Sequence, residues 1–148
     1  MRWAEKNELC LESEYEYTGS AGTCKQSECT NKYSTVYRCH NVCPNNPDAF
    51  KAALTVEPLS ITVEASSPEF RFYQSGVLKT QSCGTANDHG VLAVGYGPSG
   101  TEYAIVKNSW GHSWGDNGFV KISLDNSDPF SEEGVCGIFR EISYPDSQ

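Results

Sequence analysis

The alternation of apolar and polar positions predicts strands through most of the second half of the chain. Positions 59–64 alternate large apolar side chains with serine, threonine and glutamate, the pattern of a strand with one buried face. An apolar run at 89–97 is followed by Pro98-Ser99-Gly100, and residues 101–108 return, which predicts a hairpin. Residues 118–125 predict a further strand. The expected class is therefore α+β, strand-rich toward the C-terminus.

Helical patterns are few and short. Asn46 is suited to the N-cap of a helix, Pro47 to its first turn, and Phe50 and Leu54 then share one face. The segment Arg2–Leu11 is also interpreted as a short helix or the end of one. An aromatic cluster at positions 70, 72 and 73 is expected in the core, and residues 24–43 are expected to form a loop region held by disulfides.

Composition and charge narrow the class of protein. The 148 residues fit one domain, with 38% hydrophobic residues and a net charge of −8. This charge disfavours nucleic acid and anionic membranes as partners, because both need clustered cations. No apolar run reaches the roughly 20 residues of a membrane helix. The N-terminus lacks the apolar core of a signal peptide, so any targeting or pro-segment is expected outside this chain.

Two residues of the predicted hairpin carry candidate chemistry. His89 opens the first strand and Asn108 closes the second, so antiparallel pairing should make them neighbours. An asparagine carbonyl that binds one imidazole nitrogen fixes the tautomer and leaves the other nitrogen for proton transfer. Trp110 and Trp114 could shield this pair, although a purely structural tryptophan-rich turn is the alternative. The other two histidines are interpreted as structural or surface residues.

Two motifs resemble those of the papain family of cysteine peptidases, in particular cathepsin L and its plant relatives. They are DHGVLAVGYG at 88–97 and KNSWGHSWG at 107–115, and the likeness continues almost throughout the chain. Further matches are EY at 16–17, GFVKI at 118–122, CGI at 136–138 and SYP at 143–145.

The resemblance implies a papain-like fold with two lobes and a cleft between them. Residues 1–148 would form the strand-rich, antiparallel barrel-like C-terminal lobe with short helices, and the N-terminal lobe would carry a nucleophilic cysteine. It further implies that His89 activates this cysteine and later protonates the leaving amine, while Asn108 orients His89. Trp110 would cover the pair and Trp114 would lie on the leaving-group side.

The chain departs from the family in one respect that matters chemically. It contains neither the family's Cys-Gly-Ser-Cys-Trp-like run around the nucleophile nor the glutamine upstream of it. The expected function is thus proteolysis. This chain would be the part of an endopeptidase that bears His89 and Asn108, and it would be inactive alone.

The expected partners are a peptide substrate and the N-terminal lobe, toward which a free lobe would expose apolar surface. No cofactor or metal is expected. The alternative is a non-catalytic papain-fold module in a larger assembly.

The cysteines indicate an oxidising compartment. Seven cysteines in a chain without redox motifs favour disulfides, and the odd number leaves at least one outside a local pair. A lysosomal, vacuolar or extracellular location follows as an expectation. The resemblance implies a Cys83–Cys136 disulfide and a partner for Cys24 in the N-terminal lobe. Two local bridges of unassigned connectivity remain for Cys10, Cys29, Cys39 and Cys43. A zinc site built from Cys24, Cys29, Cys39 and Cys43 is an alternative that needs more assumptions.

The resemblance also suggests residues that select the substrate. It implies that Thr62, Asn87, Gly90 and Glu141 line the S2 pocket, with Glu141 at its base. A carboxylate in a partly desolvated pocket attracts a cation, so the hypothesis is that basic P2 residues are accepted. In the alternative interpretation Glu141 points to solvent.

Overall fold

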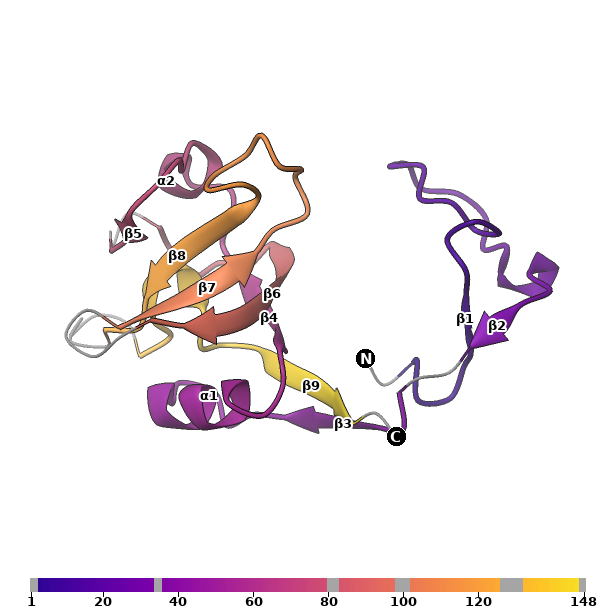
Figure 1. Ribbon diagram of the computed structural model, residues 1–148, viewed down its shortest axis with the longest axis horizontal. Helices are drawn as coiled ribbons and strands as arrows, with labels where there is room; N and C mark the ends of the chain where they lie inside the picture. Colours follow the sequence, from indigo (N-terminus) through magenta and orange to yellow (C-terminus); the bar gives the residue numbers. More distant parts are fainter. Residues whose placement is uncertain (1–2, 34–35, 80–82, 98–101, 126–131, 147–148) are drawn as a thin grey trace. The chain divides into compact units, whose positions relative to one another are not determined.

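The computed structural model divides into two compact units, each described here by itself. Unit 1 comprises Met1–His40 and Pro145–Gln148, and unit 2 comprises Asn41–Tyr144 (Figure 1). The structure describes residues 3–33, 36–79, 83–97, 102–125 and 132–146.

The main sheet consists of seven strands in the order β3-β9-β4-β6-β7-β8-β5. In that order the strands are β3 (Arg38–Asn41), β9 (Ile142–Asp146), β4 (Leu59–Val63), β6 (His89–Tyr96), β7 (Tyr103–Lys107), β8 (Phe119–Ser123) and β5 (Val77–Leu78). The neighbours from β9 to β8 pair antiparallel, whereas β5 pairs parallel with β8. The predicted strand-rich α+β class is confirmed.

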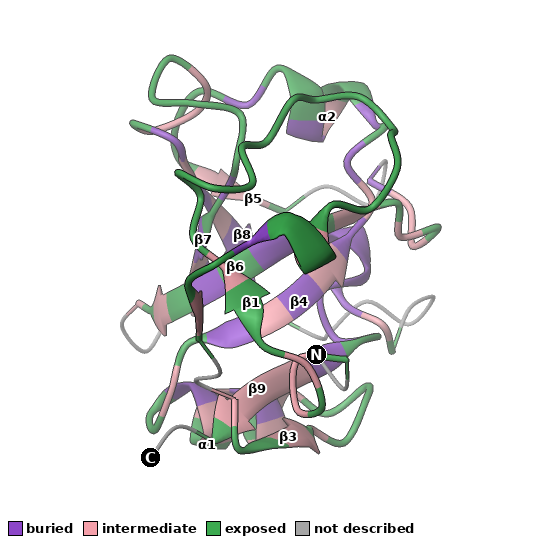
Figure 2. Ribbon diagram, turned by 90° about the vertical axis from the view of Figure 1, so that its right-hand side faces the viewer, coloured by how far each residue is buried: buried purple, intermediate pink, exposed green. Residues whose placement is uncertain are grey.

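The predicted alternation in β4 appears directly in its burial. Leu59, Ile61 and Val63 are at most 1% exposed, and the residues between them are half-buried (Figure 2). Each apolar side chain thus adds buried area on one face of the sheet, worth about 1.5–3 kcal/mol. The hairpin of β6 and β7 is also confirmed, with a register shift between Ala93 and Gly95. Its proposed turn at 98–100 lies outside the described residues.

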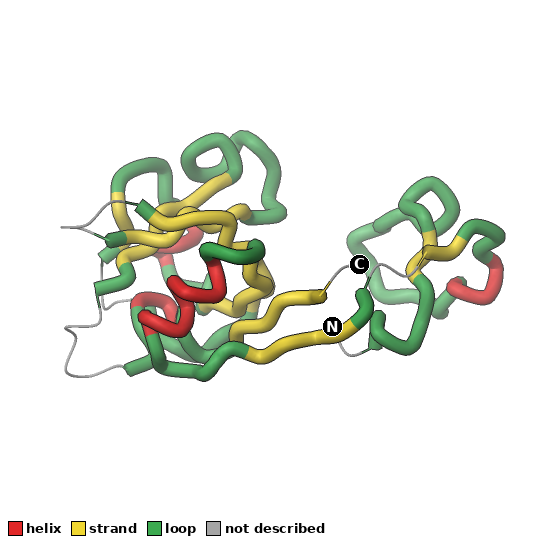
Figure 3. Tube along the Cα trace, turned by 60° about the horizontal axis from the view of Figure 1, so that its bottom comes forward, coloured by secondary structure: helices red, strands yellow, loops and turns green. Residues whose placement is uncertain are grey.

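Helix α1 (Pro47–Leu54) forms as its sequence predicts. The side chain of Asn46 accepts from the backbone N–H of Ala49 at 2.9 Å, which satisfies one free donor of the first turn. Phe50 and Leu54 are buried, and the Phe50 ring packs edge-on against Phe139 at a centroid distance of 5.5 Å. The helices are short (Figure 3), and within the described residues none is long and apolar enough to cross a membrane.

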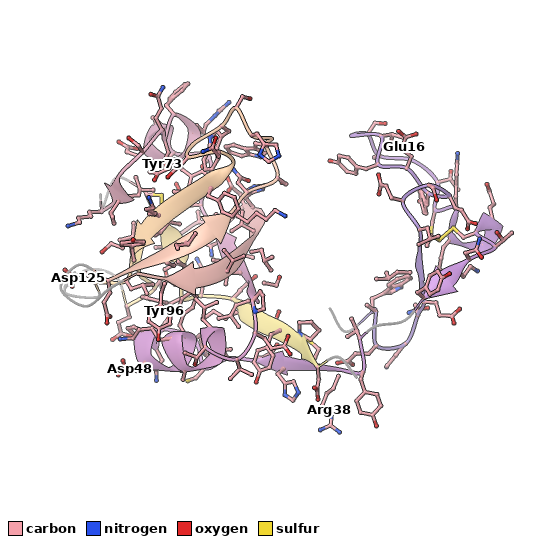
Figure 4. The ribbon with its side chains drawn as sticks, in the orientation of Figure 1. Glu16, Arg38, Asp48, Tyr73, Tyr96 and Asp125 are labelled. Atoms are coloured by element: carbon pink, nitrogen blue, oxygen red, sulfur yellow. A yellow bond between two sulfur atoms is a disulfide. The ribbon has the colours of Figure 1, made fainter. Side chains whose placement is uncertain are left out.

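Helix α2 (Pro68–Arg71) was not predicted, and it explains one wrong expectation. Ser67 caps it by accepting from the Phe70 N–H at 3.3 Å. Phe70 is fully buried, whereas Phe72 is 78% exposed and does not join the core. Residues two apart on a helical turn point about 200° apart, so both rings cannot face the same core. Tyr73, the third residue of the cluster, is buried beside α2 (Figure 4).

Unit 1 corrects the expected N-terminal helix. Residues 3–6 form turns, and the short strand β1 (Leu9–Cys10) follows and pairs with β2 (Lys32–Tyr33). A one-turn 3₁₀ helix, η1 (Gln26–Glu28), lies between them in the chain, and the Gln26 side chain donates to the Glu8 carbonyl at 2.9 Å. Strand pairing thus uses backbone groups that a helix would need, and the Cys10–Cys29 disulfide ties β1 to the segment after η1.

The cysteines are only partly bridged. Cys83 and Cys136 form a disulfide at 2.04 Å, matching the pairing implied by the resemblance, with Cys136 in the 3₁₀ helix η2 (Val135–Gly137). Cys10–Cys29 is one of the two expected local bridges. The second bridge is a wrong expectation, because Cys39 and Cys43 are free. Cys39 lies in extended β3, and an extended chain separates residues four apart by about 13 Å, too far for a disulfide.

A four-cysteine zinc site is not possible in this arrangement. The sulfur of Cys29 is bonded to Cys10 and cannot serve as a thiolate ligand. Cys24 is free and exposed. Among the described residues no three histidine, cysteine or acidic side chains converge as a metal site would require.

Candidate functional site

The predicted pair of His89 and Asn108 is formed. His89 is the first residue of β6, and Asn108 follows the last residue of β7. Their side chains meet with Nε2 of His89 2.8 Å from Oδ1 of Asn108. Asn108 is 7% exposed, and its backbone N–H donates to the Gly118 carbonyl at 3.0 Å. The backbone on both sides of the pair is therefore fixed by strand pairing.

A second donor determines how the imidazole is protonated. The backbone N–H of Ser109 donates to Oδ1 of Asn108 at 2.7 Å, so this atom must be the amide oxygen rather than the nitrogen. Nε2 of His89 must then carry the proton and donate to that oxygen. In a neutral imidazole only one nitrogen is protonated, which leaves Nδ1 as the basic nitrogen.

Asn108 also has an unsatisfied group. Its Nδ2 is buried and has no hydrogen-bond partner in the part of the chain that the structure describes. An unpartnered buried donor is unfavourable by about 1–3 kcal/mol. The amide cannot turn over to relieve this, because its nitrogen would then face the N–H groups of His89 and Ser109. Asn108 therefore keeps the amide orientation that binds His89, although this orientation leaves its buried Nδ2 without a partner in the part of the chain that the structure describes.

An aromatic cluster encloses one side of the pair. The Trp110 ring lies 5.0 Å from the His89 ring at an interplanar angle of 31°. Trp110 in turn packs edge-on against Trp114 at 5.3 Å and against Phe70 at 5.7 Å. Tyr73 packs against Trp114 at 5.9 Å. Each such ring pair contributes about 0.5–1.5 kcal/mol beyond its buried area, so the cluster holds the indole over the imidazole.

Helix α2 packs against this aromatic cluster. Phe70 is fully buried beneath both indoles, and its ring lies 5.2 Å from that of Trp114. The indole N–H of Trp114 donates to the backbone carbonyl of Arg71 at 3.0 Å. This helix was not predicted, although Ser-Pro-Glu at 67–69 combines a cap, a first-turn proline and a first-turn acid.

His89 opens onto a surface hollow of about 430 Å³. Its lining residues are Ala65, Ser66, Arg71, Phe72, Asp88, His89 and Trp110. The Asp88 carboxylate accepts from the Ala65 N–H at 2.7 Å, which ties the residue before His89 to the loop after β4. No cysteine lines this hollow. Neither Asp88 nor Arg71 was predicted from the sequence as a site residue.

The four residues predicted to line S2 gather around Thr62. Its hydroxyl accepts from Nδ2 of Asn87 at 2.7 Å, and its N–H donates to the Glu141 carbonyl at 3.3 Å. Gly90 is its partner across β4 and β6. Thr62 and Glu141 line a hollow of about 480 Å³, Gly90 lines another of about 330 Å³, and Asn87 lines neither. The side chain of Glu141 is exposed.

Gly137 keeps Asn87 in place. Asn87 also donates to the Gly137 carbonyl at 3.0 Å. Gly137 has φ +71°, and a Cβ there would lie 2.1 Å from Oδ1 of Asn87. A glycine is therefore required at 137 both by the backbone conformation and by the closeness of the Asn87 side chain. The Cys83–Cys136 disulfide holds the same segment.

A strand-rich α+β fold that joins a histidine and an asparagine under a tryptophan is papain-like. The family model described as papain family cysteine protease matches residues 1–146, and the chain belongs to this family. Thiol protease SEN102 of Hemerocallis sp. is 41% identical over 143 residues, covering 95% of this chain and 39% of that protein. The KDEL-tailed cysteine endopeptidase CEP2 of Arabidopsis thaliana is 42% identical over 138 residues, covering 93% and 37%.

Two solved protease structures are also similar to this chain. The cysteine protease CMS1MS2 of Carica candamarcensis, in complex with E-64, matches with a TM-score of 0.88 and 30% identity, covering 99% of this chain and 66% of that one. The bromelain protease of Ananas comosus, in complex with the E64 inhibitor, matches at 0.80 and 36%, covering 94% and 63%. The chain spans about two fifths of the length of the curated relatives it matches.

Proposed function

We propose that this chain is the C-terminal lobe of a papain-family cysteine endopeptidase, in which His89 and Asn108 activate a cysteine of an N-terminal lobe. One observation carries the proposal: Oδ1 of Asn108 binds both Nε2 of His89 and the Ser109 N–H, which leaves Nδ1 of His89 basic. Membership of the papain family supports the reaction class.

The proposed reaction moves one proton onto His89 and back. Nδ1 takes the proton of the cysteine thiol, and the thiolate attacks the peptide carbonyl carbon to form a C–S bond. The imidazolium gives its proton to the amine nitrogen as the C–N bond breaks. Water then attacks the thioester with His89 as the base, which releases the acid and restores the thiol. Throughout, Asn108 accepts from Nε2 and keeps the ring in one orientation.

The exposed face of strand β6 favours contact with another protein surface. Alternate residues Gly90, Leu92, Val94 and Tyr96 are exposed, at 37–40% for the three large side chains. In an antiparallel sheet with one solvated face, the exposed positions are usually polar. An apolar row on this face favours burial against another protein surface, and in the proposal this surface is the N-terminal lobe. The exposed, free Cys24 is the proposed site of a disulfide to that lobe.

Substrate selection at P2 is part of the proposal. The arrangement of Thr62, Asn87 and Gly90 supports an S2 pocket, with Glu141 at the edge of the neighbouring hollow. Glu141 would then attract a basic P2 side chain. In the complete enzyme, Glu141→Ala should lower the cleavage of peptides with Arg at P2 relative to peptides with Phe at P2. An unchanged Arg/Phe ratio would reject this assignment.

The proposed location is a lysosomal, vacuolar or extracellular compartment. Two disulfides support it, because disulfides persist where the environment is oxidising. Formation of both bridges in material isolated from the natural source, detected by mass spectrometry before and after reduction, tests this part of the proposal. Fully reduced cysteines in freshly alkylated native material would contradict it.

The test of the function uses the complete two-lobe enzyme. His89→Ala should lower kcat/KM for a fluorogenic peptide by about 10³-fold or more, because the thiolate loses its base and the amine its acid. His112→Ala is the matched control, since His112 is exposed and its Nδ1 lies 3.3 Å from the Asn117 carbonyl. Equal activity in the two variants would reject the proposal and favour a non-catalytic module.

A further inference from the structure

Arg71 places a positive charge on the wall of the hollow that contains His89. Arg71 is the last residue of α2, and its backbone is fixed at both ends: its N–H donates to Ser67 and its carbonyl accepts from Trp114. The side chain of Arg71 is exposed and lines the hollow. In the part of the chain that the structure describes, no carboxylate pairs with its guanidinium. The position is therefore rigid while the charge remains available.

Three other cations of unit 2 are paired with carboxylates. Lys51 pairs with Asp48 and Glu102, Lys121 with Asp116, and Arg140 with Glu133, at 2.9–3.4 Å. In a chain of net charge −8, an arginine without a carboxylate partner among the described residues, in the same hollow as His89, is a local exception to the overall charge.

The one carboxylate in the same hollow does not neutralise Arg71. Asp88 lines the hollow, but its Oδ1 accepts from the Ala65 N–H at 2.7 Å and is held against the loop after β4. No ion pair joins Asp88 to Arg71 among the described residues. The Arg71 charge is therefore left for an acidic group of a ligand.

We propose that Arg71 selects an acidic side chain of the substrate on the leaving-group side of the scissile bond. The proposal rests on the proposed function and on the family resemblance, which implies that Trp114 lies on that side. The Trp114 indole N–H donates to the backbone carbonyl of Arg71. The guanidinium presents a planar set of donors that matches a carboxylate with two parallel hydrogen bonds. Phe72 and Trp110 line the same hollow and give such a pair apolar neighbours.

The experiment compares matched peptides in the complete enzyme. A fluorogenic peptide series carries Glu, Gln or Lys in turn at each of the first three positions after the cleaved bond. The enzyme should prefer Glu to Gln by about fivefold in kcat/KM at one of these positions, the strength of an exposed but well-oriented ion pair. Arg71→Gln should reduce this ratio to about one, and Arg71→Glu should reverse it in favour of Lys.

Two conditions separate an ion pair from a general structural effect. The Glu/Gln ratio should decline with added salt, because screening weakens exposed charge pairs. Lys51→Gln removes the same charge from α1 and should leave the ratio unchanged. A ratio near one in the parent enzyme, or one that survives Arg71→Gln, overturns the inference.

A binding measurement keeps this inference distinct from the proposed function. If the complete enzyme cleaves no peptide in the series, the proposed function fails, and the 148-residue chain still tests Arg71. The Nε–H resonance of Arg71, assigned by its loss in Arg71→Lys, should shift on titration with a short Glu-containing peptide and remain in place with its Gln counterpart. Equal shifts, or no shift with either peptide, overturn the inference.

Discussion

Nε2 of His89 and Oδ1 of Asn108 lie 2.8 Å apart, and the Ser109 N–H fixes which amide atom faces the ring. Removal of the Asn108 carbonyl should disturb the orientation of the His89 ring, whereas His89 itself remains as the base. In the complete enzyme, Asn108→Ala should lower kcat by roughly 10- to 100-fold, part of the 10²–10⁴ that positioned acid–base catalysis contributes. Asn108→Asp keeps an acceptor for both donors and should retain more activity. Equal losses in the two variants, at equal thermal stability, would contradict the orienting function.

The Phe70 ring beneath the indoles should be a main source of local stability. Phe70→Ala should destabilise the chain by about 3–5 kcal/mol, because it leaves a cavity under Trp110 and Trp114. Phe72→Ala, two residues away and 78% exposed, is the control and should change stability by less than about 0.5 kcal/mol. Urea unfolding of the three proteins measures both values. Similar effects at the two positions would show that α2 is not packed as described.

The Cys83–Cys136 disulfide should stabilise unit 2. Replacing Cys83 and Cys136 together by serine should cost about 2–5 kcal/mol, since the bridge closes a loop across a sequence separation of 53. Cys24→Ser removes a free thiol and should leave the stability of the isolated chain unchanged. Thermal unfolding without reductant compares the variants. A double variant as stable as the parent would contradict a structural function for this bridge.

Unit 1 contains a carboxylate whose ionisation is linked to its local structure. Glu14 accepts from the backbone and side chains of Asn31 and Thr30 at 2.6–3.0 Å. These bonds, that from the Asn31 backbone first, lower the pKa of Glu14 from its ordinary value of 4.5 to about 2. Because the folded pKa is the lower one, the stabilisation is present above about pH 4.5 and is lost as the pH falls toward 2.

Hydrogen exchange at the Asn31 amide measures this effect. Protection should be constant above pH 5, after correction for intrinsic exchange rates, and should decrease between pH 4.5 and 2. Glu14→Gln should lower protection above pH 4.5 and remove that pH dependence. Glu16→Gln, at an exposed position two residues on, is the matched control and should behave as the parent does. Identical pH profiles for parent and Glu14→Gln would contradict the linkage.

Regular elements could be predicted where local pattern and tertiary packing agree. The capped helix α1, the alternating strand β4 and the β6–β7 hairpin follow from spacing, and the hairpin is what joins His89 to Asn108. Segment 2–11 could not be predicted, because β1 depends on pairing with β2 and on a disulfide to Cys29. Spacing alone was insufficient there.

The supporting parts of the site were harder to predict for a different reason. Phe70 and Phe72 have equal hydrophobicity, and only the single turn of α2 sends one ring inward and the other to solvent. The unpaired state of Arg71 depends on which carboxylates find other partners in three dimensions. Neither property is a feature of the local sequence.

The most direct test measures peptide hydrolysis with the two proposed lobes apart and together. This chain is refolded alone and with an N-terminal lobe from a papain-family relative, and E-64-sensitive cleavage of a fluorogenic peptide is recorded. Neither lobe should cleave alone, and the combination should cleave only when His89 is intact. Cleavage by this chain alone, or cleavage by a combination that carries His89→Ala, would contradict the account.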